Sequence, residues 1–155
     1  MEVTVIMKLE DLTLDIEQSV EMKADVGDVF KRTIYRLGEG NSTPDGASMN
    51  MILEEWAGGR WFRDRGEGIQ HLWGHLQVIK PPVLIELSGP MFMSYPAINH
   101  LEFKFDKIAG GTKLTLRHRA IGLIDPVHRE NISTGWGHLM DAIKGDFSQE
   151  AKATS

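Results

Sequence analysis

The segment from Asp125 to Lys144, which reads DPVHRENISTGWGHLMDAIK, decides the fold of this chain. Asp125 is a residue type that caps helices, and Pro126 is favoured at the first helical position. Apolar side chains then recur on one helical face, at Ile132, Trp136, Leu139, Met140 and Ile143. We therefore expect a long amphipathic helix that ends near Lys144 and buries this face.

Short segments of strand composition precede the helix. Six are expected, at Asn50–Trp56, Arg60–Asp64, His71–Lys80, Val83–Ser88, Asn99–Asp106 and Thr112–Gly122. Glycine and proline separators of hairpin length, such as Gly58-Gly59 and Gly110-Gly111, divide them. Strands that follow one another along the chain are therefore expected to pair in space.

The N-terminal part adds one strand, one helix and a loop. Apolar and polar residues alternate over Leu12–Lys23, and a further strand segment over Val3–Met7 could extend its front. Asp25 can cap a helix of about thirteen residues, which Gly38 ends. The following stretch Gly38–Ser48 is rich in glycine, serine and proline, which predicts a mobile loop.

These elements together predict an α+β fold in which a curved seven-stranded antiparallel sheet wraps around the long C-terminal helix. Strand parity divides one strand between two faces: Leu101, Phe103 and Phe105 toward the helix, and His100, Glu102 and Lys104 toward water. Such a sheet and helix can enclose a hollow for an apolar molecule.

Length and composition limit the classes of protein. A chain of 155 residues favours one domain, expected over residues 1–146, followed by a polar tail over 147–155. The formal net charge is −5, and acidic and basic residues are interspersed along the chain. Nucleic-acid binding would require a basic face, so this pattern argues against it. The absence of cysteine excludes disulfides and thiol nucleophiles. The apolar runs are too short for a signal peptide or membrane insertion, so the cytoplasm is the expected location.

Several motifs, in their order, carry a resemblance to a known family: Gly58-Gly59-Arg60, Trp73-Gly74, Pro81-Pro82, Gly110-Gly111-Thr112-Lys113-Leu114-Thr115-Leu116-Arg117-His118 and Gly135-Trp136-Gly137-His138-Leu139-Met140-Asp141. From Leu12 to Lys144 the chain resembles the START-like or SRPBCC superfamily, in the branch named after activators of the heat-shock chaperone ATPase. The resemblance implies a helix-grip fold of the birch-pollen-allergen type, with a cavity between the sheet and the C-terminal helix. Members of the superfamily bind lipids, sterols and polyketides, and some are cyclases or co-chaperones. One departure is the Gly38–Ser48 loop, which has no aromatic residue where relatives carry a tryptophan pair.

The candidate cavity residues are Trp56, Arg60, Phe62, Trp73, Phe103, His118, Trp136 and Met140. Tryptophan and methionine offer adaptable apolar surface, although the same residue types fill ordinary cores. His118 lies two residues from Leu116 in the same strand, so its side chain is expected on the buried face of the sheet. There, a core histidine with a hydrogen-bond partner is favoured over a histidine that contacts a ligand. Arg60 could hold a ligand carboxylate or pair with a surface acid.

No catalytic residue, cofactor or metal site is predicted. His71 and His75 would lie about 13 Å apart along a strand, and His128 and His138 are expected on nearly opposite sides of their helix. No glycine-rich phosphate loop is present.

Three functions stay open at this stage. The first is binding of a small hydrophobic or amphipathic ligand, such as a lipid, a sterol or a polyketide-like molecule, without a reaction. The second is a polyketide cyclase or aromatase, in which His118, Arg60 or Glu54 would move protons. The third is an interaction module with a chaperone partner, which would use an exposed apolar patch. A homodimer formed through an outer strand is also open. The lack of a catalytic constellation favours the first function over an enzyme.

Overall fold

The computed structural model describes residues 2 and 8–153, with residues 149–153 described by their backbone alone. The elements follow in the order α1 (Leu9–Leu12), β1 (Thr13–Met22), α2 (Val26–Leu37), β2 (Met51–Leu53), β3 (Arg60–Asp64), β4 (Gln70–Lys80), β5 (Leu84–Gly89), β6 (Ala97–Ile108), β7 (Gly111–Gly122) and α3 (Pro126–Ala153). The expected order of one strand, one helix, six strands and a long helix is confirmed.

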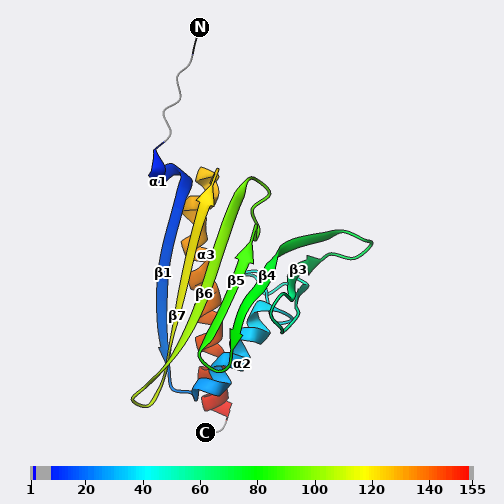
Figure 1. Ribbon diagram of the computed structural model, residues 1–155. Coiled ribbons are helices and arrows are strands. Elements are labelled where there is room, and N and C mark those ends of the chain that lie inside the picture. The colour runs from blue at the N-terminus through cyan, green and yellow to red at the C-terminus, as the bar shows by residue number, and fades with distance from the viewer. Residues whose placement is uncertain (1, 3–7, 154–155) are drawn as a thin grey trace.

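The seven strands form one antiparallel sheet in the order β1-β7-β6-β5-β4-β3-β2. Strands β2 to β7 pair with their neighbours in sequence, and β1 closes the other edge beside β7, with Ile16 opposite His118. Both long helices lie on the same side of the sheet (Figure 1). The predicted fold class, a sheet gripping a C-terminal helix, is therefore correct.

The first strand is one residue shorter at each end than predicted, and the first long helix has twelve residues where about thirteen were expected. Asp25 caps α2 by accepting a hydrogen bond from the amide of Gly27, and the amide of Gly38 bonds back to the carbonyls of Ile34 and Tyr35. A short helix, α1, precedes β1 and was not expected. The possible strand extension over Val3–Met7 lies outside the described residues.

The second strand is shorter than the sequence predicts. The expected strand Asn50–Trp56 retains only Met51–Leu53, because the chain then folds into a tight turn. In this turn the amide of Gly59 bonds to the carbonyl of Trp56 at 2.8 Å. A side chain at Gly59 would lie 2.2 Å from the Glu54 carbonyl oxygen, so the turn requires glycine. This turn carries Trp56 away from the sheet.

The closing helix is longer than expected. Asp125 caps it through the amide of Val127 at 2.8 Å, as predicted, but the helix runs to Ala153 instead of ending near Lys144. Two contacts hold the additional turns: Phe147 packs against the core, and Asp146 bonds the side chain of Arg36 on α2. Most of the segment predicted as a polar tail is therefore helix. The domain limit at residue 146 stays a prediction.

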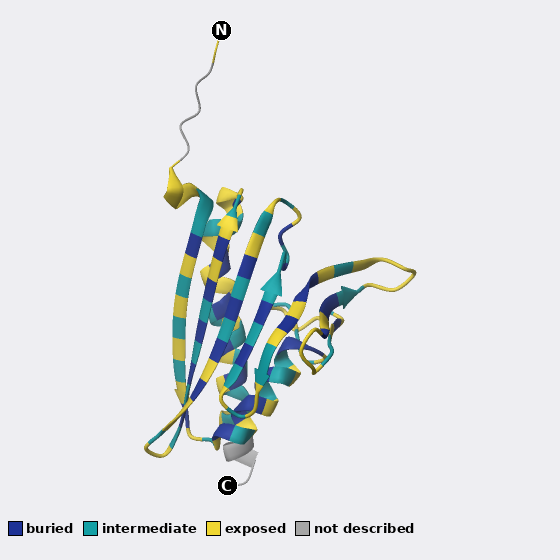
Figure 2. Cartoon of the chain, viewed as in Figure 1, coloured by how far each residue is buried: buried dark blue, intermediate teal, exposed yellow. Residues whose placement is uncertain are grey.

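The two faces of the sheet differ as strand parity predicts. Leu101, Phe103 and Phe105 are buried under the helices, whereas Lys104 is exposed on the other face. Buried residues alternate mainly with half-buried ones along β6 and β7 (Figure 2). The apolar stripe of α3 completes the core with Ile132, Trp136, Met140 and Ile143, all buried.

The position of α3 leaves the part of the sheet around β3 and β4 less covered by this helix than the edge at β1. The helix packs on β1 and α2, and the side-chain amide of Gln18 on β1 donates to the carbonyl of Ser133 at 2.7 Å. β1 stands at one edge of the sheet, while β3 and β4 lie near the opposite edge. Tryptophan side chains on β3 and β4 therefore face α3 across a space.

Candidate ligand-binding pocket

A pocket of about 670 Å³ occupies this space between α3, β3, β4 and the chain that follows α2. We call the last of these the connecting segment and define it as residues 38–49. Its contribution to the pocket wall comes from Gly40 to Pro44, Gly46 and Met49. The pocket opens to solvent on one side, and its volume is in the range of known small-molecule sites.

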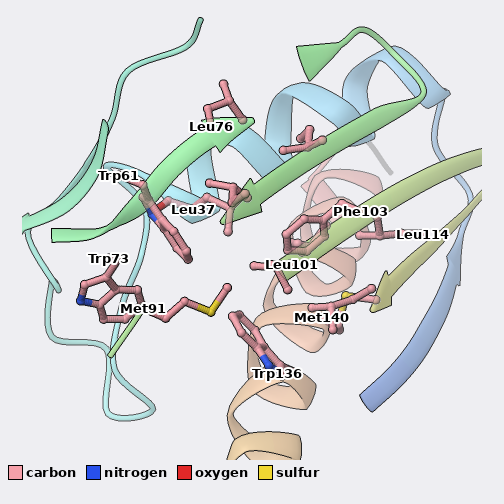
Figure 3. Packing of buried hydrophobic residues seen from close by; sticks show 14 of the residues in the cluster. Leu37, Trp61, Trp73, Leu76, Met91, Leu101, Phe103, Leu114, Trp136 and Met140 are labelled. Atoms are coloured by element: carbon pink, nitrogen blue, oxygen red, sulfur yellow. The ribbon is translucent and has the colours of Figure 1, made fainter. Parts of the chain in front are cut away.

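A continuous series of aromatic rings forms the apolar wall. Trp61 on β3 and Trp73 on β4 meet edge to face at 5.1 Å between ring centroids. Trp73 contacts Phe92 at 5.7 Å, and Phe92 contacts Trp136 on α3 at 6.5 Å. Figure 3 shows Trp61 and Trp73 on one side and Trp136 on the other, with Met91 between them. The wall therefore consists of flat, rigid surfaces that suit an apolar or aromatic ligand.

The three pocket tryptophans differ in the partners of their indole nitrogens. Trp61 donates to the Leu37 carbonyl at 2.8 Å, and Trp136 donates to His118 Nδ1 at 2.9 Å. Trp73 Nε1 is buried and has no hydrogen-bond partner among the described residues. Two of the three donors are thus used within the protein, and the third is unused.

His118 is a buried structural residue with both ring nitrogens engaged. Because Nδ1 accepts from Trp136, Nε2 carries the proton and donates to the Asn99 side-chain oxygen at 2.7 Å. The Asn99 amide nitrogen donates in turn to the carbonyls of Gly89 and Pro90, at 3.1 and 3.2 Å. Burial lowers the pKa of His118 from 6.5 to about 4, so its ring is neutral at pH 7.

Polar groups also line the pocket or contact residues that do. Tyr95 and His128 share a hydrogen bond of 2.9 Å between the phenol oxygen and Nδ1, and burial raises the pKa of Tyr95. The Arg36 guanidinium bonds Asp146 at 2.8 Å and the Gly40 carbonyl at 3.2 Å, which joins α2, α3 and the connecting segment. Polar side chains such as Arg36 and His128 therefore line the pocket together with the aromatic rings.

The expectation that His128 and His138 lie on nearly opposite sides of α3 is wrong, because both line the pocket. Ten residues turn an α-helix by nearly three full turns, which leaves the two roughly 80° apart. Among the residues that the structure describes, no group of three histidine, aspartate or glutamate side chains could hold a metal ion. Within the same part of the chain, no helix is long and apolar enough to cross a membrane.

The predicted candidate residues fall into three groups. Trp73 and Trp136 line the pocket. Phe103, His118 and Met140 are buried in the core and do not line it.

The third group, Trp56, Arg60 and Phe62, lies outside the pocket. Trp56 is 58% exposed on the β2–β3 turn. Arg60 bonds Glu54 at 2.7 Å on the surface, and its guanidinium lies 4.8 Å from the Phe62 ring centroid. The hydrogen bonds from Arg60 lower the pKa of the Glu54 carboxyl to about 2. Of the two roles that the sequence allowed for Arg60, the structure therefore shows the surface ion pair.

Several pocket residues were not singled out from the sequence. Leu37 and Met49 line the pocket but were not among the candidates, and Ile132 was predicted only as part of the buried face of the closing helix. Phe92 follows the Gly89-Pro90 turn, where the strand pattern stops and the backbone of Met91 has a φ of 54°. The Gly-Pro pair signals a turn, but it does not indicate that the turn directs Phe92 toward α3.

A second hollow of about 520 Å³ lies at the far end of the sheet, between the end of β1, the β6–β7 turn and Phe147. It has no tryptophan in its wall, and Glu21, Lys23 and Lys144 contribute to it. The pocket between α3 and β4 is therefore the better candidate for an apolar ligand.

Comparisons with known proteins show the fold. No family model and no curated protein sequence matches the chain. Among solved structures it is similar to the di-domain ARO/CYC protein StfQ from the steffimycin biosynthetic pathway, with a TM-score of 0.66 and 16% identity over 93% of this chain and 53% of StfQ. It is also similar to Ara h 8.0201, with a TM-score of 0.64 and 12% identity over 88% of this chain and 99% of that one.

A third similar structure is an AHSA1-like protein from Aeromonas hydrophila, with a TM-score of 0.62 and 13% identity over 90% of this chain and 94% of that one. These identities are too low to transfer a ligand or a reaction. The seven-stranded sheet, the closing helix and these likenesses show that the chain has a helix-grip fold.

Proposed function

We propose that this chain binds a small, largely apolar ligand in the pocket between α3, β3, β4 and the connecting segment. The observation that carries the proposal is the series of Trp61, Trp73, Phe92 and Trp136 around an open space of about 670 Å³. Tryptophan rings supply large apolar area at low entropic cost, and their flat faces favour ring systems over flexible chains. A polycyclic or polyketide-like molecule therefore fits better than a fatty acid.

Fluorene, a flat tricyclic hydrocarbon, is a suitable first probe, and palmitate tests the alternative of an acyl chain. Binding can be followed by tryptophan fluorescence and by the melting temperature, which a ligand of the folded state raises. We expect fluorene to bind and to raise the melting temperature, and palmitate to bind more weakly.

Two glycines on α3 provide a matched pair of variants that locate the binding. A Cβ at either Gly135 or Gly145 meets no atom within 4 Å, so both accept a side chain. Gly135 lines the pocket and Gly145 does not. Gly135→Leu should weaken fluorene binding about tenfold or more, because the leucine occupies ligand space, whereas Gly145→Leu should not change it. Equal binding by both variants would mean that the ligand binds elsewhere.

The other two functions have less support. The suggested proton carriers are engaged elsewhere, since His118 bonds Asn99 and Trp136, and Arg60 bonds Glu54. StfQ and the AHSA1-like protein share only the fold at these identities. A cyclase activity, a chaperone partner and a homodimer therefore stay predictions from the sequence.

A further inference from the structure

We propose that the ligand of this pocket carries an acceptor oxygen of the carbonyl kind on its ring system, and that His128 Nε2 on α3 donates a hydrogen bond to this oxygen. This inference rests on the proposed function and adds the chemistry of the ligand. It also assigns Tyr95 as a positioning residue, because the Tyr95 phenol determines which ring nitrogen of His128 carries the hydrogen.

The first argument is that His128 has one engaged ring nitrogen and one that is unused and accessible. Nδ1 bonds the Tyr95 phenol oxygen at 2.9 Å, and Nε2 has no hydrogen-bond partner among the described residues. In the same part of the chain, the buried side-chain nitrogens without a partner are Trp73 Nε1 and His100 Nδ1. His128 is half-buried and its Nε2 is not one of these buried atoms, so a ligand can reach it.

The second argument concerns the direction of this nitrogen. His128 lines the pocket, whereas Tyr95 does not. The two nitrogens of an imidazole ring point away from each other, so Nε2 points away from Tyr95. Phe92, which also lines the pocket, meets His128 edge to face at 5.9 Å between ring centroids. The His128 ring therefore stands beside Phe92 in the wall, with Nδ1 turned out of the pocket and Nε2 on the pocket side.

The third argument concerns the hydrogen on the His128 ring. Burial raises the pKa of Tyr95, so the phenol keeps its hydrogen at neutral pH and can donate it to His128 Nδ1. A neutral imidazole ring has one N–H, and with Nδ1 as the acceptor the hydrogen is on Nε2. Nε2 is then a donor, and its partner must be an acceptor. A carbonyl oxygen on a ring system satisfies both this donor and the aromatic wall.

The fourth argument is that the His128 ring is held in place. The centroids of the Tyr95 and Phe92 rings lie 5.4 and 5.9 Å from that of His128. His138 also lines the pocket, but its side chain is exposed and has no ring contact or hydrogen bond within the described residues. A donor that is already fixed loses less conformational entropy when a ligand binds. His128 is therefore the better donor of the two histidines.

The test uses fluorene and 9-fluorenone, two tricyclic probes of nearly the same shape that differ by one carbonyl oxygen. Their dissociation constants are measured for the wild-type protein and for His128→Phe, which keeps an aromatic ring and removes both ring nitrogens. His75→Phe is the control for the loss of a histidine, because His75 is exposed on β4 outside the pocket. Because the two probes also differ in water solubility, the quantity compared is the ratio of their dissociation constants in each protein.

We expect His128→Phe to weaken fluorenone binding about three- to tenfold, as the loss of one hydrogen bond predicts. Fluorene binding should stay within about twofold, and His75→Phe should leave both affinities unchanged. An equal change for both probes in His128→Phe, or no change for either, overturns the inference while leaving the proposed function intact. A selective loss of fluorenone binding in His138→Phe instead would also overturn it. Failure of both probes to bind the wild-type protein overturns both proposals.

Tyr95→Phe tests the positioning role of the phenol. Tyr95 does not line the pocket, so fluorene binding should not change. Without the phenol, the hydrogen of His128 can be on either ring nitrogen, and fluorenone binding should weaken by part of the amount expected for His128→Phe. An unchanged ratio of the two dissociation constants in Tyr95→Phe would contradict this role.

A second measurement needs no variant to remain stable. Nitrogen-15 NMR of the six histidine rings distinguishes a nitrogen that carries a hydrogen from one that does not. His128 is identified by its nuclear Overhauser contacts with the rings of Phe92 and Tyr95. At mildly alkaline pH, where an ordinary histidine is neutral, its hydrogen should be on Nε2, and the Nε2 resonance should move with fluorenone and not with fluorene. A hydrogen on Nδ1, or equal movement with both probes, would contradict the proposed contact.

Discussion

Trp136 on α3 donates a hydrogen bond of 2.9 Å to His118 on β7, and this bond joins the closing helix to the sheet at the wall of the pocket. His118 continues the connection to Asn99, which bonds the carbonyls of Gly89 and Pro90. The chain that carries Phe92 begins at these two residues. One buried series of hydrogen bonds therefore helps to position both Trp136 and Phe92, which come from different parts of the sequence.

The first prediction concerns acid pH. Burial lowers the folded-state pKa of His118 to about 4 from its usual value of 6.5, so between these values the unfolded chain binds the extra proton. The free energy of unfolding should therefore fall as the pH is lowered from 6.5 to 4, by roughly 3 kcal/mol, and this contribution should change no further below pH 4. Urea unfolding at several pH values measures it.

His118→Gln provides the comparison, because glutamine does not titrate. The stability of this variant should depend less on pH between 6.5 and 4 than that of the wild type. The Glu54 carboxylate, whose pKa is lowered to about 2, loses its contribution mostly below this window and does not obscure the result. Parallel pH profiles of the two proteins would show that His118 is not the titrating group.

The second prediction concerns the Trp136 indole. Trp136→Phe removes the donor and leaves His118 Nδ1 buried without its partner. The cost should be about 1–3 kcal/mol of unfolding free energy, with some further loss of packing area. Chemical denaturation measures the loss, and Trp56→Phe, at a position that is 58% exposed, should be close to wild type. A Trp136→Phe variant as stable as the control would mean that the bond contributes nothing net.

The third prediction concerns a close approach of two strands beside Trp73. A Cβ at Gly74 would lie 2.4 Å from the Ser88 carbonyl oxygen, and a Cβ at Gly89 would lie 2.4 Å from the Gly74 Cα. Gly74→Ala should therefore destabilise the protein by about 1–3 kcal/mol or more, because backbone has to move. In contrast, Gly135→Ala should stabilise α3 by about 0.5–1 kcal/mol. Thermal unfolding of the two variants should give shifts of opposite sign.

The fourth prediction concerns the link between the two long helices. The Arg36 and Asp146 side chains are 22% and 12% exposed, and their hydrogen bond raises the pKa of the Arg36 guanidinium. Asp146→Asn should reduce the free energy of unfolding by about 1–3 kcal/mol. The loss should change little with salt, because the pair is partly shielded from water.

Glu54→Gln is the matched control for that variant, since it breaks the exposed pair with Arg60. Its effect on stability should be smaller, and added salt should reduce the difference from wild type. A larger effect at Glu54 than at Asp146 would contradict this ranking of the two ion pairs.

Local periodicity was sufficient to predict the fold. The alternation in β6 placed Leu101 and Phe103 on the buried face, and the spacing of Ile132, Trp136 and Met140 predicted the buried face of α3. Both patterns depend only on residues close in sequence. The buried faces of β6 and α3 could therefore be predicted without a structure. The end of α3 was missed because Phe147 and Asp146 are held by contacts with distant residues.

The candidate site was only partly predictable, for the same physical reason. Trp73 and Trp136 were found because large aromatic residues on the buried face suit a cavity. Trp56 has the same chemistry, but the turn at Gly59 holds it in solvent. The partners of His118 lie 18 and 19 residues away in sequence, and no spacing rule connects them. Tertiary contacts therefore decided which aromatic residues line the pocket.

The connecting segment contributes one whole side of the pocket, whereas the remaining walls belong to the sheet and the closing helix. Substitutions within these twelve positions, 38–49, can alter the entrance and its selectivity while the supporting framework keeps its packing. A chain of this design could acquire a new ligand by exchanging a short surface stretch, with little penalty to its folding.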